Sequence, residues 1–220
     1  TCSMTNLTAP AALLGPVIQN NATILAGIIL TQLINPGNPV IYGTVSTATD
    51  MRSVACSIGA PEAQLIQMAS LAQLPVRTGI AGTDSLKPDY QAGVESFMVL
   101  MTTYLGKSDF VLNHAGILQS YALGSYEKFV LDEEVNRILL RLNRGIDISD
   151  VKAEKVFDAI KKAGPLGNYL SGRTPKEYRE DNYLASDVFN RKGCKENTRE
   201  EQGDIRERAK KVYDARMEAY

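Results

Sequence analysis

The sequence predicts an α/β fold in which helices cover a parallel sheet, followed by a helical extension at the C-terminal end. Two patterns lead to this prediction. Short apolar runs recur about every 35 residues with helix-like segments between them, and charged side chains are concentrated late in the chain. Residues 1–105 contain eight charged side chains, whereas 23 of the 48 residues from Arg173 onward are charged. We therefore expect the first half to be buried on most sides and the end of the chain to be solvated.

Three apolar runs mark the expected strands: PVIYG from Pro39, PVRTG from Pro75 and DFVLN from Asp109. The first two begin 36 residues apart, and the third follows 34 residues later. Strands that alternate with helices at this spacing form right-handed βαβ units and a parallel sheet. The run CSMT at the start of the chain is a further strand candidate.

Helices are expected between these strands, in residues 61–74 and 88–105. Pro61 and Pro88 suit a first helical turn, where the missing N–H is not needed. Ahead of the first strand, residues 10–34 are predicted to form one long or broken helix, with a kink at Gly15-Pro16.

An open doubly wound sheet and a (β/α)8 barrel both satisfy this alternation. A typical barrel has about 250 residues, and eight units of the observed length would need roughly 280. The chain offers three clear strands. We therefore expect residues 1–145 to be the C-terminal half of a TIM barrel, cut from a longer chain or completed by missing N-terminal residues.

The remaining residues, 146–220, are expected to form a charged helical C-terminal extension. Directly ahead of this extension, residues 125–145 carry an apolar stripe at helical spacing and end at a glycine, which predicts a helix. Residues 147–164 repeat this design with Ser149 as the N-cap. Residues 204–220 predict an exposed helix rich in oppositely charged pairs.

Composition argues against several classes of protein. The net charge of -1 gives no electrostatic reason to expect nucleic acid or an anionic membrane as a partner. Cys2, Cys56 and Cys194 are odd in number and far apart, which suits a reducing cytoplasm, and no CxxC motif predicts a metal site. The chain opens without the charged region of a signal peptide, and its longest apolar run, residues 22–34, is too short to span a bilayer. We expect a cytoplasmic protein with no directly bound metal.

Candidate functional residues follow the three predicted strands, because ligands in parallel α/β sheets bind beyond the carboxyl ends of the strands. The three loops carry Tyr42, Thr44, Ser46, Thr49, Asp50 and Arg52, then Arg77, Thr78, Asp84, Ser85 and Lys87, then Asn113, His114, Gln119, Tyr121 and Tyr126.

Structural roles compete with functional ones at these positions. Asp84 or Ser85 can cap the helix after Pro88, and the single histidine, His114, can be satisfied by a backbone carbonyl. Asp50 can pair with its neighbour across the loop, and Glu127 suits a first helical turn. The tyrosines are packing candidates, although two or three that face one mouth could hold a cation. The residues alone name no reaction, since GTDS lacks the spacing of a phosphate loop.

Four long segments then carry a family resemblance: NLTAPAALLG, LTQLINPGNPVIYGTVSTATDMRS, GAPEAQLIQMASLAQLPVRTGIAGTDSLKPDYQAGVES and HAGILQSYALGSYEKFVLDEE. In this order they resemble the trimethylamine:corrinoid methyltransferase family over about residues 6–145. The resemblance implies a longer TIM-barrel enzyme of methanogenesis from methylamines. Such an enzyme moves a methyl group from trimethylamine to the Co(I) corrinoid of a cognate corrinoid protein and releases dimethylamine. It also implies a homo-oligomer, a trimer or hexamer, and a possible pyrrolysine in the chain.

The implied chemistry assigns roles to the loop residues. The corrinoid is the nucleophile, so the protein must position the amine and stabilise the departing nitrogen. On this basis the candidate catalytic residues are Asp84, His114, Leu86 and Lys87, and the candidate substrate-binding residues are Tyr42, Asp50, Asn113, Tyr121, Tyr126 and Glu127.

One position departs from the family pattern. Where a lysine is expected directly after the TD-small triplet, Leu86 stands, with Lys87 next. This is a variant, a register shift, or a leucine written for an unusual residue. Two other hypotheses stay open: a pyrrolysine-free homologue that demethylates glycine betaine or another quaternary amine, and an inactive truncated barrel segment.

Overall fold

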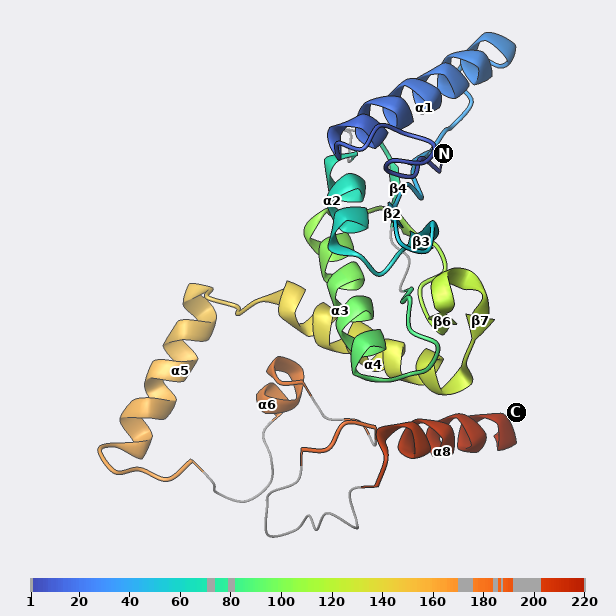
Figure 1. The fold of residues 1–220 in the computed structure, drawn as a ribbon. Coiled ribbons are helices and arrows are strands. Elements are labelled where there is room, and N and C mark those ends of the chain that lie inside the picture. Colours follow the sequence, from blue (N-terminus) through green and yellow to red (C-terminus); the bar gives the residue numbers. More distant parts are fainter. Residues whose placement is uncertain are drawn as a thin grey trace.

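The computed structural model describes residues 2–70, 74–78, 82–169, 176–183, 186, 188–191 and 203–219. Helices dominate these residues, and the strands between them are short (Figure 1). The mixed α/β class expected from the sequence is confirmed.

The central sheet is parallel and has three strands, β1 (Tyr42–Gly43), β4 (Val76–Thr78) and β5 (Phe110–Val111), in that order. In register, Tyr42 lies opposite Val76 and Arg77 lies opposite Phe110. The three strands predicted from the apolar runs are therefore confirmed. Where the sequence suggested a strand at the start of the chain, the structure has two isolated bridges, between Met4 and Thr47 and between Thr5 and Ala9.

No closed barrel is formed by the described residues. A (β/α)8 barrel closes because its first and eighth strands pair, whereas the parallel sheet here has three strands and two unpaired edges. The predicted half barrel is thus not confirmed beyond its βαβ units. The division of the chain into a barrel part, residues 1–145, and a C-terminal extension, residues 146–220, stays a prediction.

Two antiparallel hairpins were missed by the sequence reading. One joins β2 (Ala48–Asp50) to β3 (Ala55–Ser57), and the other joins β6 (Ile117–Leu118) to β7 (Leu123–Gly124). The second hairpin therefore separates β5 from the helical stripe predicted in residues 125–145. Strands of two or three residues are too short to show the alternation of apolar and polar side chains by which strands are recognised.

The first three helices are α1 (Leu14–Ile34), α2 (Pro61–Ala69) and α3 (Tyr90–Leu105). Pro61 occupies the first turn of α2, as predicted. The predicted kink at Gly15-Pro16 is wrong, because α1 begins at Leu14 and the proline falls in its first turn, where no N–H is needed.

Helix α1 is longer than the apolar run identified in the sequence. Among the described residues it alone is long and apolar enough to cross a membrane by length and composition, and 6% of the tested window is buried. The apolar run identified in the sequence is shorter than this helix because the run begins at Ala22, whereas the helix begins at Leu14. The first half of the helix contacts β1 and the segment after it through polar groups. Tyr42 Oη donates to Asn21 Oδ1 at 3.2 Å, and Ser46 Oγ donates to Asn20 Oδ1 at 3.4 Å.

The start of α3 is fixed by an aspartate rather than a proline. Asp89 is the N-cap, and its Oδ1 accepts from the backbone N–H of Ala92 at 3.0 Å. Pro88, predicted in the first turn, precedes this cap. Capping by Asp84 or Ser85 is therefore wrong, although Ser85 Oγ donates to the Asp89 carboxylate at 3.0 Å and so supports the cap.

Asp89→Ala is expected to destabilise the protein by about 1 kcal/mol at pH 7, the usual cost of losing an N-cap. The N–H of Ala92 holds the pKa of Asp89 below its ordinary 3.8. The stabilisation is therefore present above that value and is lost as the pH falls through the lowered pKa. The free energy of unfolding in urea is measured for the wild type and for Asp89→Ala, once at pH 7 and once at a pH below the lowered pKa of Asp89. Asp158→Ala, on an exposed helix surface, is the control. A cost that is independent of pH would contradict it.

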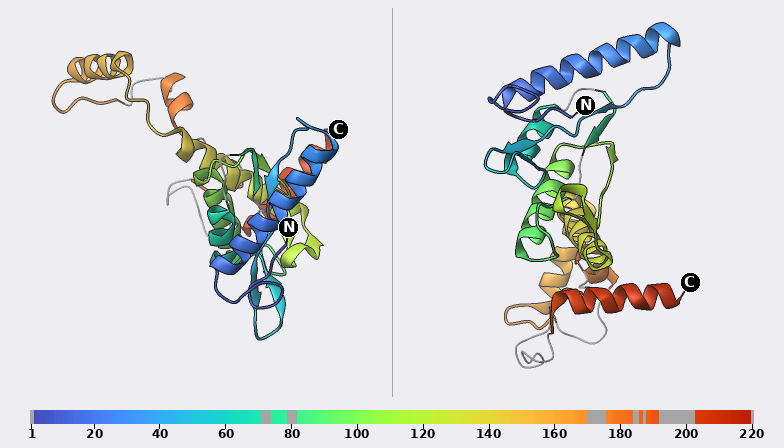
Figure 2. Two further views of the ribbon diagram at one scale, coloured as in Figure 1. Left: turned by 90° about the horizontal axis from the view of Figure 1, so that it is seen from above. Right: turned by 45° about the vertical axis from the view of Figure 1, so that its right-hand side comes forward.

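The later helices are α4 (Tyr126–Arg144), α5 (Asp150–Ala163), α6 (Lys176–Asp181) and α8 (Ile205–Glu218). Helix α4 has the predicted apolar stripe and ends at Gly145, whose φ of 65° suits glycine. It packs on both sides (Figures 1 and 2). Leu100 of α3 meets its Val135 and Leu139, and Ala209 of α8 meets its Val130.

Candidate functional site at the strand ends

Three loops meet beyond the carboxyl ends of the parallel strands, and Asp84 joins them. Its Oδ1 accepts from the backbone N–H of Ile58 at 3.1 Å, and its Oδ2 accepts from that of Gly59 at 3.3 Å. The hydroxyl of Ser120 also donates to Asp84 Oδ1. The half-buried carboxylate thus binds the β3 end, its own loop and the loop after β5 together.

Backbone hydrogen bonds join two of these loops directly. The N–H of Gln119 donates to the carbonyl of Ser85 at 2.9 Å, and the N–H of Ser120 donates to that of Thr83 at 3.0 Å. The Ser120 hydroxyl lies 3.0 Å from the carbonyl of Cys56. The sequence-based expectation that the loops converge is confirmed for these segments.

Glu95 supports Asp84 from α3. Its Oε2 accepts from the Asp84 N–H at 2.8 Å and from the Thr83 hydroxyl, while its Oε1 accepts from Gln91 at 2.8 Å. Gly59 makes this possible, because a Cβ at that position would lie 2.2 Å from Glu95 Oε2.

The loop after β5 has an unusual backbone. Positive φ angles occur at four non-glycine residues between positions 113 and 121 and at one glycine: Asn113 (52°), Gln119 (45°), Ser120 (48°), Tyr121 (82°) and Gly116 (80°). Non-glycine residues rarely adopt this region, and each costs of order 1–3 kcal/mol that the surroundings must supply. Such residues gather at ligand-binding and catalytic loops. This concentration marks residues 113–121 as the leading functional segment.

Arg77 lies in β4, the central strand of the parallel sheet, and its charge acts on Tyr121 of the loop after β5. It is the half-buried middle residue of β4, and its Nε is buried without a hydrogen-bond partner among the described residues. Its side chain passes over Gly43 of β1, where an added Cβ would lie 3.1 Å from Arg77 Cδ. A guanidinium with an unused donor is suited to bind an anionic group.

The positive charge of Arg77 acts on the phenol group of Tyr121. Burial raises the pKa of Tyr121 to about 12, while a hydrogen bond with Asn113 and the charge of Arg77 lower it. The phenol is therefore neutral at physiological pH and can serve as a hydrogen-bond donor but not as a base. Asn113, Tyr121 and Asp84 are the predicted site residues that the structure brings together.

His114 is half-buried on a different cavity. Burial lowers the pKa of His114 first of all, with the charge of Asp132 raising it and that of Lys128 lowering it. The imidazole is therefore mostly neutral at pH 7. It lines a cavity of about 440 Å³ together with Leu100 and Tyr104. The described residues that line this cavity do not include Asp84, Arg77 or Tyr121.

A buried ion pair beneath this loop was missed by the sequence reading. Lys128 Nζ lies 2.6 Å from Asp132 Oδ2 and donates to Ser96 Oγ at 2.8 Å. The same Asp132 oxygen accepts from the N–H of Gly116 at 2.8 Å. Both charged residues are nearly inaccessible, at 1% and 2% exposure. Burial lowers the pKa of Lys128 and raises that of Asp132, and each charge opposes the shift of the other.

The remaining candidates lie elsewhere. Tyr42 is in the core of β1 and contacts α1, and burial raises the pKa of its phenol. Asp50 is exposed at the β2–β3 turn, where it accepts from the Arg52 N–H at 3.0 Å, a bond that lowers its pKa. The side chains of Leu86 and Lys87 are exposed, and Lys87 lines a second cavity of about 510 Å³ beside α8.

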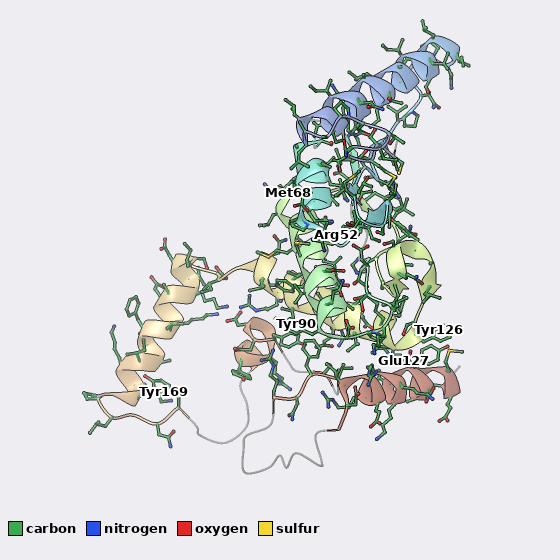
Figure 3. All side chains as sticks on the ribbon, viewed as in Figure 1. Arg52, Met68, Tyr90, Tyr126, Glu127 and Tyr169 are labelled. Atoms are coloured by element: carbon green, nitrogen blue, oxygen red, sulfur yellow. The ribbon has the colours of Figure 1, made fainter. Side chains whose placement is uncertain are left out.

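Tyr126 and Glu127 face the C-terminal helix rather than the sheet (Figure 3). The ring of Tyr126 stacks on Tyr213 with centroids 4.6 Å apart. Glu127 accepts from Ser125 Oγ at 2.7 Å, and this bond lowers its pKa. The structure does not bring these two residues to the strand ends, and their role in substrate binding stays a prediction.

No group of three or more metal-ligating side chains of the His, Cys, Asp or Glu type gathers within the residues that the structure describes. The polar groups at the strand ends are instead Arg77, whose charge acts on Tyr121, and Asp84, which accepts a hydrogen bond from Ser120, the residue before Tyr121.

Comparison with known proteins places the chain in context. A family model described as Trimethylamine methyltransferase (MTTB) matches residues 4–220. The chain is 84% identical over its full length to the proline betaine:corrinoid methyltransferase of Eubacterium limosum and 58% identical to the L-carnitine:corrinoid methyltransferase of that organism. Over 82% of its length it is 43% identical to the glycine betaine methyltransferase of Desulfitobacterium hafniense (strain Y51), of which that match covers 38%. The chain spans 46% of the length of each of the first two relatives.

Proposed function

Because the chain belongs to the trimethylamine methyltransferase family, we propose that it is part of a corrinoid-dependent methyltransferase whose substrate is a quaternary amine bearing a carboxylate. The three relatives named above are described by proline betaine, carnitine and glycine betaine. Each of these molecules combines a methylated cationic nitrogen with a carboxylate. Trimethylamine, the substrate expected from the sequence and named in the family description, has no carboxylate and is the second candidate.

Arg77 is the observation that carries this proposal. Its buried Nε has no partner among the described residues, and Arg77 is the middle residue of β4, the central strand of the parallel sheet. A carboxylate bound there would gain a charge-assisted hydrogen bond. Trimethylamine would leave the same donor unsatisfied, which costs free energy at a buried position.

The reaction asks little acid–base chemistry of the protein. A corrinoid on a partner protein supplies the nucleophile, which takes the methyl group while the bonding electron pair stays on nitrogen. A quaternary nitrogen already carries its positive charge, so the leaving group is a neutral tertiary amine and no proton or covalent activation of nitrogen is needed. The protein positions the substrate. Arg77 anchors its carboxylate, and Asp84 together with the ring of Tyr121 stabilises its cation.

Because the protein needs only to position a substrate that is already charged, this mechanism favours a pyrrolysine-free homologue over a trimethylamine methyltransferase that uses pyrrolysine. Within the part of the chain that the structure describes, Leu86 and Lys87 are exposed, and Lys87 lines the cavity beside α8, which neither Arg77 nor Tyr121 lines. A quaternary amine does not require an electrophilic residue to activate it. The three parallel strands are compatible with a barrel completed by other parts of a longer protein.

The test uses the full-length protein that contains this chain. Proline betaine, carnitine, glycine betaine and trimethylamine are supplied separately, and methylation of a reduced corrinoid protein is followed by absorbance. We expect methylation with at least one carboxylated quaternary amine. Turnover of trimethylamine alone would contradict the proposal.

Arg77→Met is expected to lower kcat/KM for the carboxylated substrate by roughly 10- to 150-fold, since a hydrogen bond to a charged group is worth about 1.5–3 kcal/mol. Arg52→Met, at the exposed β2–β3 turn, is the matched control and should change little. Binding of tetramethylammonium, measured as competitive inhibition, should be similar in both variants. Equal losses for the carboxylated substrate and for tetramethylammonium would exclude a carboxylate anchor at Arg77.

A further inference from the structure

The turn that carries Asp84 is held on both sides by hydrogen bonds to its backbone. The carbonyl of Thr83 accepts from the N–H of Ser120 at 3.0 Å, and the carbonyl of Ser85 accepts from the N–H of Gln119 at 2.9 Å. Inside the turn, the N–H of Ser85 donates to Thr83 Oγ1 at 3.0 Å. The direction in which the Asp84 carboxylate points is therefore set by groups outside its own side chain.

Glu95 of α3 is the acceptor that completes this turn. Its Oε2 accepts from the N–H of Asp84 at 2.8 Å and from the hydroxyl of Thr83. Because the proton of that hydroxyl is directed at Glu95, a lone pair of its oxygen is free to accept from the N–H of Ser85. One carboxylate oxygen thus fixes the N–H groups of two neighbouring residues, one directly and one through a hydroxyl.

The strained end of the loop after β5 is bonded to the same turn. Gln119, Ser120 and Tyr121 are consecutive residues with positive φ angles, a strain that the surroundings must compensate. The N–H groups of Gln119 and Ser120 donate to the turn, and the hydroxyl of Ser120 donates to Asp84. The turn therefore helps to hold Tyr121 in place as well as Asp84.

Gly59 leaves the space that the Glu95 carboxylate occupies. A Cβ at this position would overlap Oε2 and Cδ of Glu95. Gly59 is not among the residues with positive φ, so alanine would suit its backbone, and the contact with Glu95 is what excludes a side chain. Its N–H also donates to Asp84 Oδ2 at 3.3 Å. The same glycine therefore serves both carboxylates.

We propose that Glu95 is a positioning residue for methyl transfer, which sets the places of Asp84 and Tyr121 without contacting the substrate. The inference rests on the proposed function, because that function assigns stabilisation of the substrate cation to these two residues. Glu95 acts by accepting hydrogen bonds from the turn. Its loss matters for the rate because misplacing a positioned group by about 1 Å can lower the rate about 100-fold.

The first test compares Glu95→Ala with Glu95→Gln in the full-length protein. Glu95→Ala leaves the Asp84 N–H and the Thr83 hydroxyl without this acceptor, and kcat/KM should fall at least about tenfold. Glu95→Gln keeps an acceptor oxygen and should retain most of the activity. Glu154→Ala, at an exposed position of α5, is the matched control and should change kcat/KM by less than about twofold.

The measurement is methylation of the reduced corrinoid protein, made well below the unfolding temperature of each variant. The methyl donor is whichever of the four amines named above the wild type uses. Use of trimethylamine alone would contradict the proposed substrate class and still test Glu95. Unchanged kcat/KM in Glu95→Ala, with only the free energy of unfolding lowered, would overturn the positioning role. An equal loss in Glu95→Gln and Glu95→Ala would overturn it too, because the charge would then be the contribution.

The second test displaces the Glu95 carboxylate without removing it. Gly59→Ala should lower kcat/KM by a factor similar to that of Glu95→Ala. The double variant should lose less than about twofold more than Glu95→Ala alone, because both changes act on one contact. Gly93→Ala is the matched control, since an added Cβ there meets nothing within 4 Å. Losses that multiply in the double variant would show that Gly59 does not act through Glu95 and would refute this arrangement.

Discussion

Lys128→Met is expected to destabilise the protein by about 3–5 kcal/mol, the usual cost of leaving one partner of a buried ion pair uncompensated. Asp132 would then be buried at 2% exposure without the ammonium group of Lys128, and it would retain the N–H of Gly116 as a donor. Urea unfolding of the variant measures the loss. Lys155→Met, on the exposed face of α5, is the control and should change stability by less than about 0.5 kcal/mol.

The double variant Lys128→Met/Asp132→Leu separates the cost of an orphaned charge from the value of the pair. Replacing both partners of a buried ion pair with apolar residues is often neutral or stabilising. We expect the double variant to recover most of the stability lost in Lys128→Met. It should not recover activity, because the N–H of Gly116 loses its acceptor and the strained loop of residues 113–121 loses a support. A double variant that is both stable and fully active would show that the pair does not position this loop.

Asp84→Ala is the second change with a large expected effect. It removes the acceptor for the N–H groups of Ile58 and Gly59 and for the hydroxyl of Ser120. Each buried donor left without a partner costs about 1–3 kcal/mol. We expect stability to fall by at least about 2 kcal/mol and kcat/KM for the substrate to fall at least about 100-fold.

Asp50→Ala is the matched control for Asp84, because Asp50 also accepts from a backbone N–H and a serine hydroxyl. It is exposed at a turn, so water replaces the lost bonds. Thermal unfolding and corrinoid methylation are measured on both variants. Equal effects of the two substitutions would show that Asp84 is an ordinary turn residue.

Parts of the site were accessible to sequence reasoning because they follow from position. A polar residue in a loop that follows a strand of a parallel sheet is expected near the carboxyl edge, and this rule predicted Asp84, Asn113 and Tyr121 in one region. The same rule failed for Tyr126, because two short strands and a turn intervene between β5 and α4 and carry that residue to the far end of the loop.

Other site residues gave no sequence signal. Lys128 and Asp132 have the spacing of an exposed helical ion pair, which is the common case. They are buried because α3 and the loop at Gly116 cover that face of α4. Glu95 likewise resembles a surface acid of α3. Its contact with Asp84 depends on the absence of a side chain at Gly59, 36 residues earlier in the chain.

By itself, the sequence determined the alternation of strands and helices, the stripe on α4, the amphipathic α5 and the family, because each depends on local spacing or on long ordered motifs. Tertiary structure decided which of the loop residues bond to one another and which residues are buried. Hydrogen bonds at Asp84 join segments far apart in the chain. Lys128 and Asp132 are neighbours on one helix, but they are buried against Ser96 and Gly116, which come from other parts of the chain. The proposed role of Arg77 depends on the same kind of observation, because only the folded chain shows that its buried Nε has no hydrogen-bond partner among the described residues.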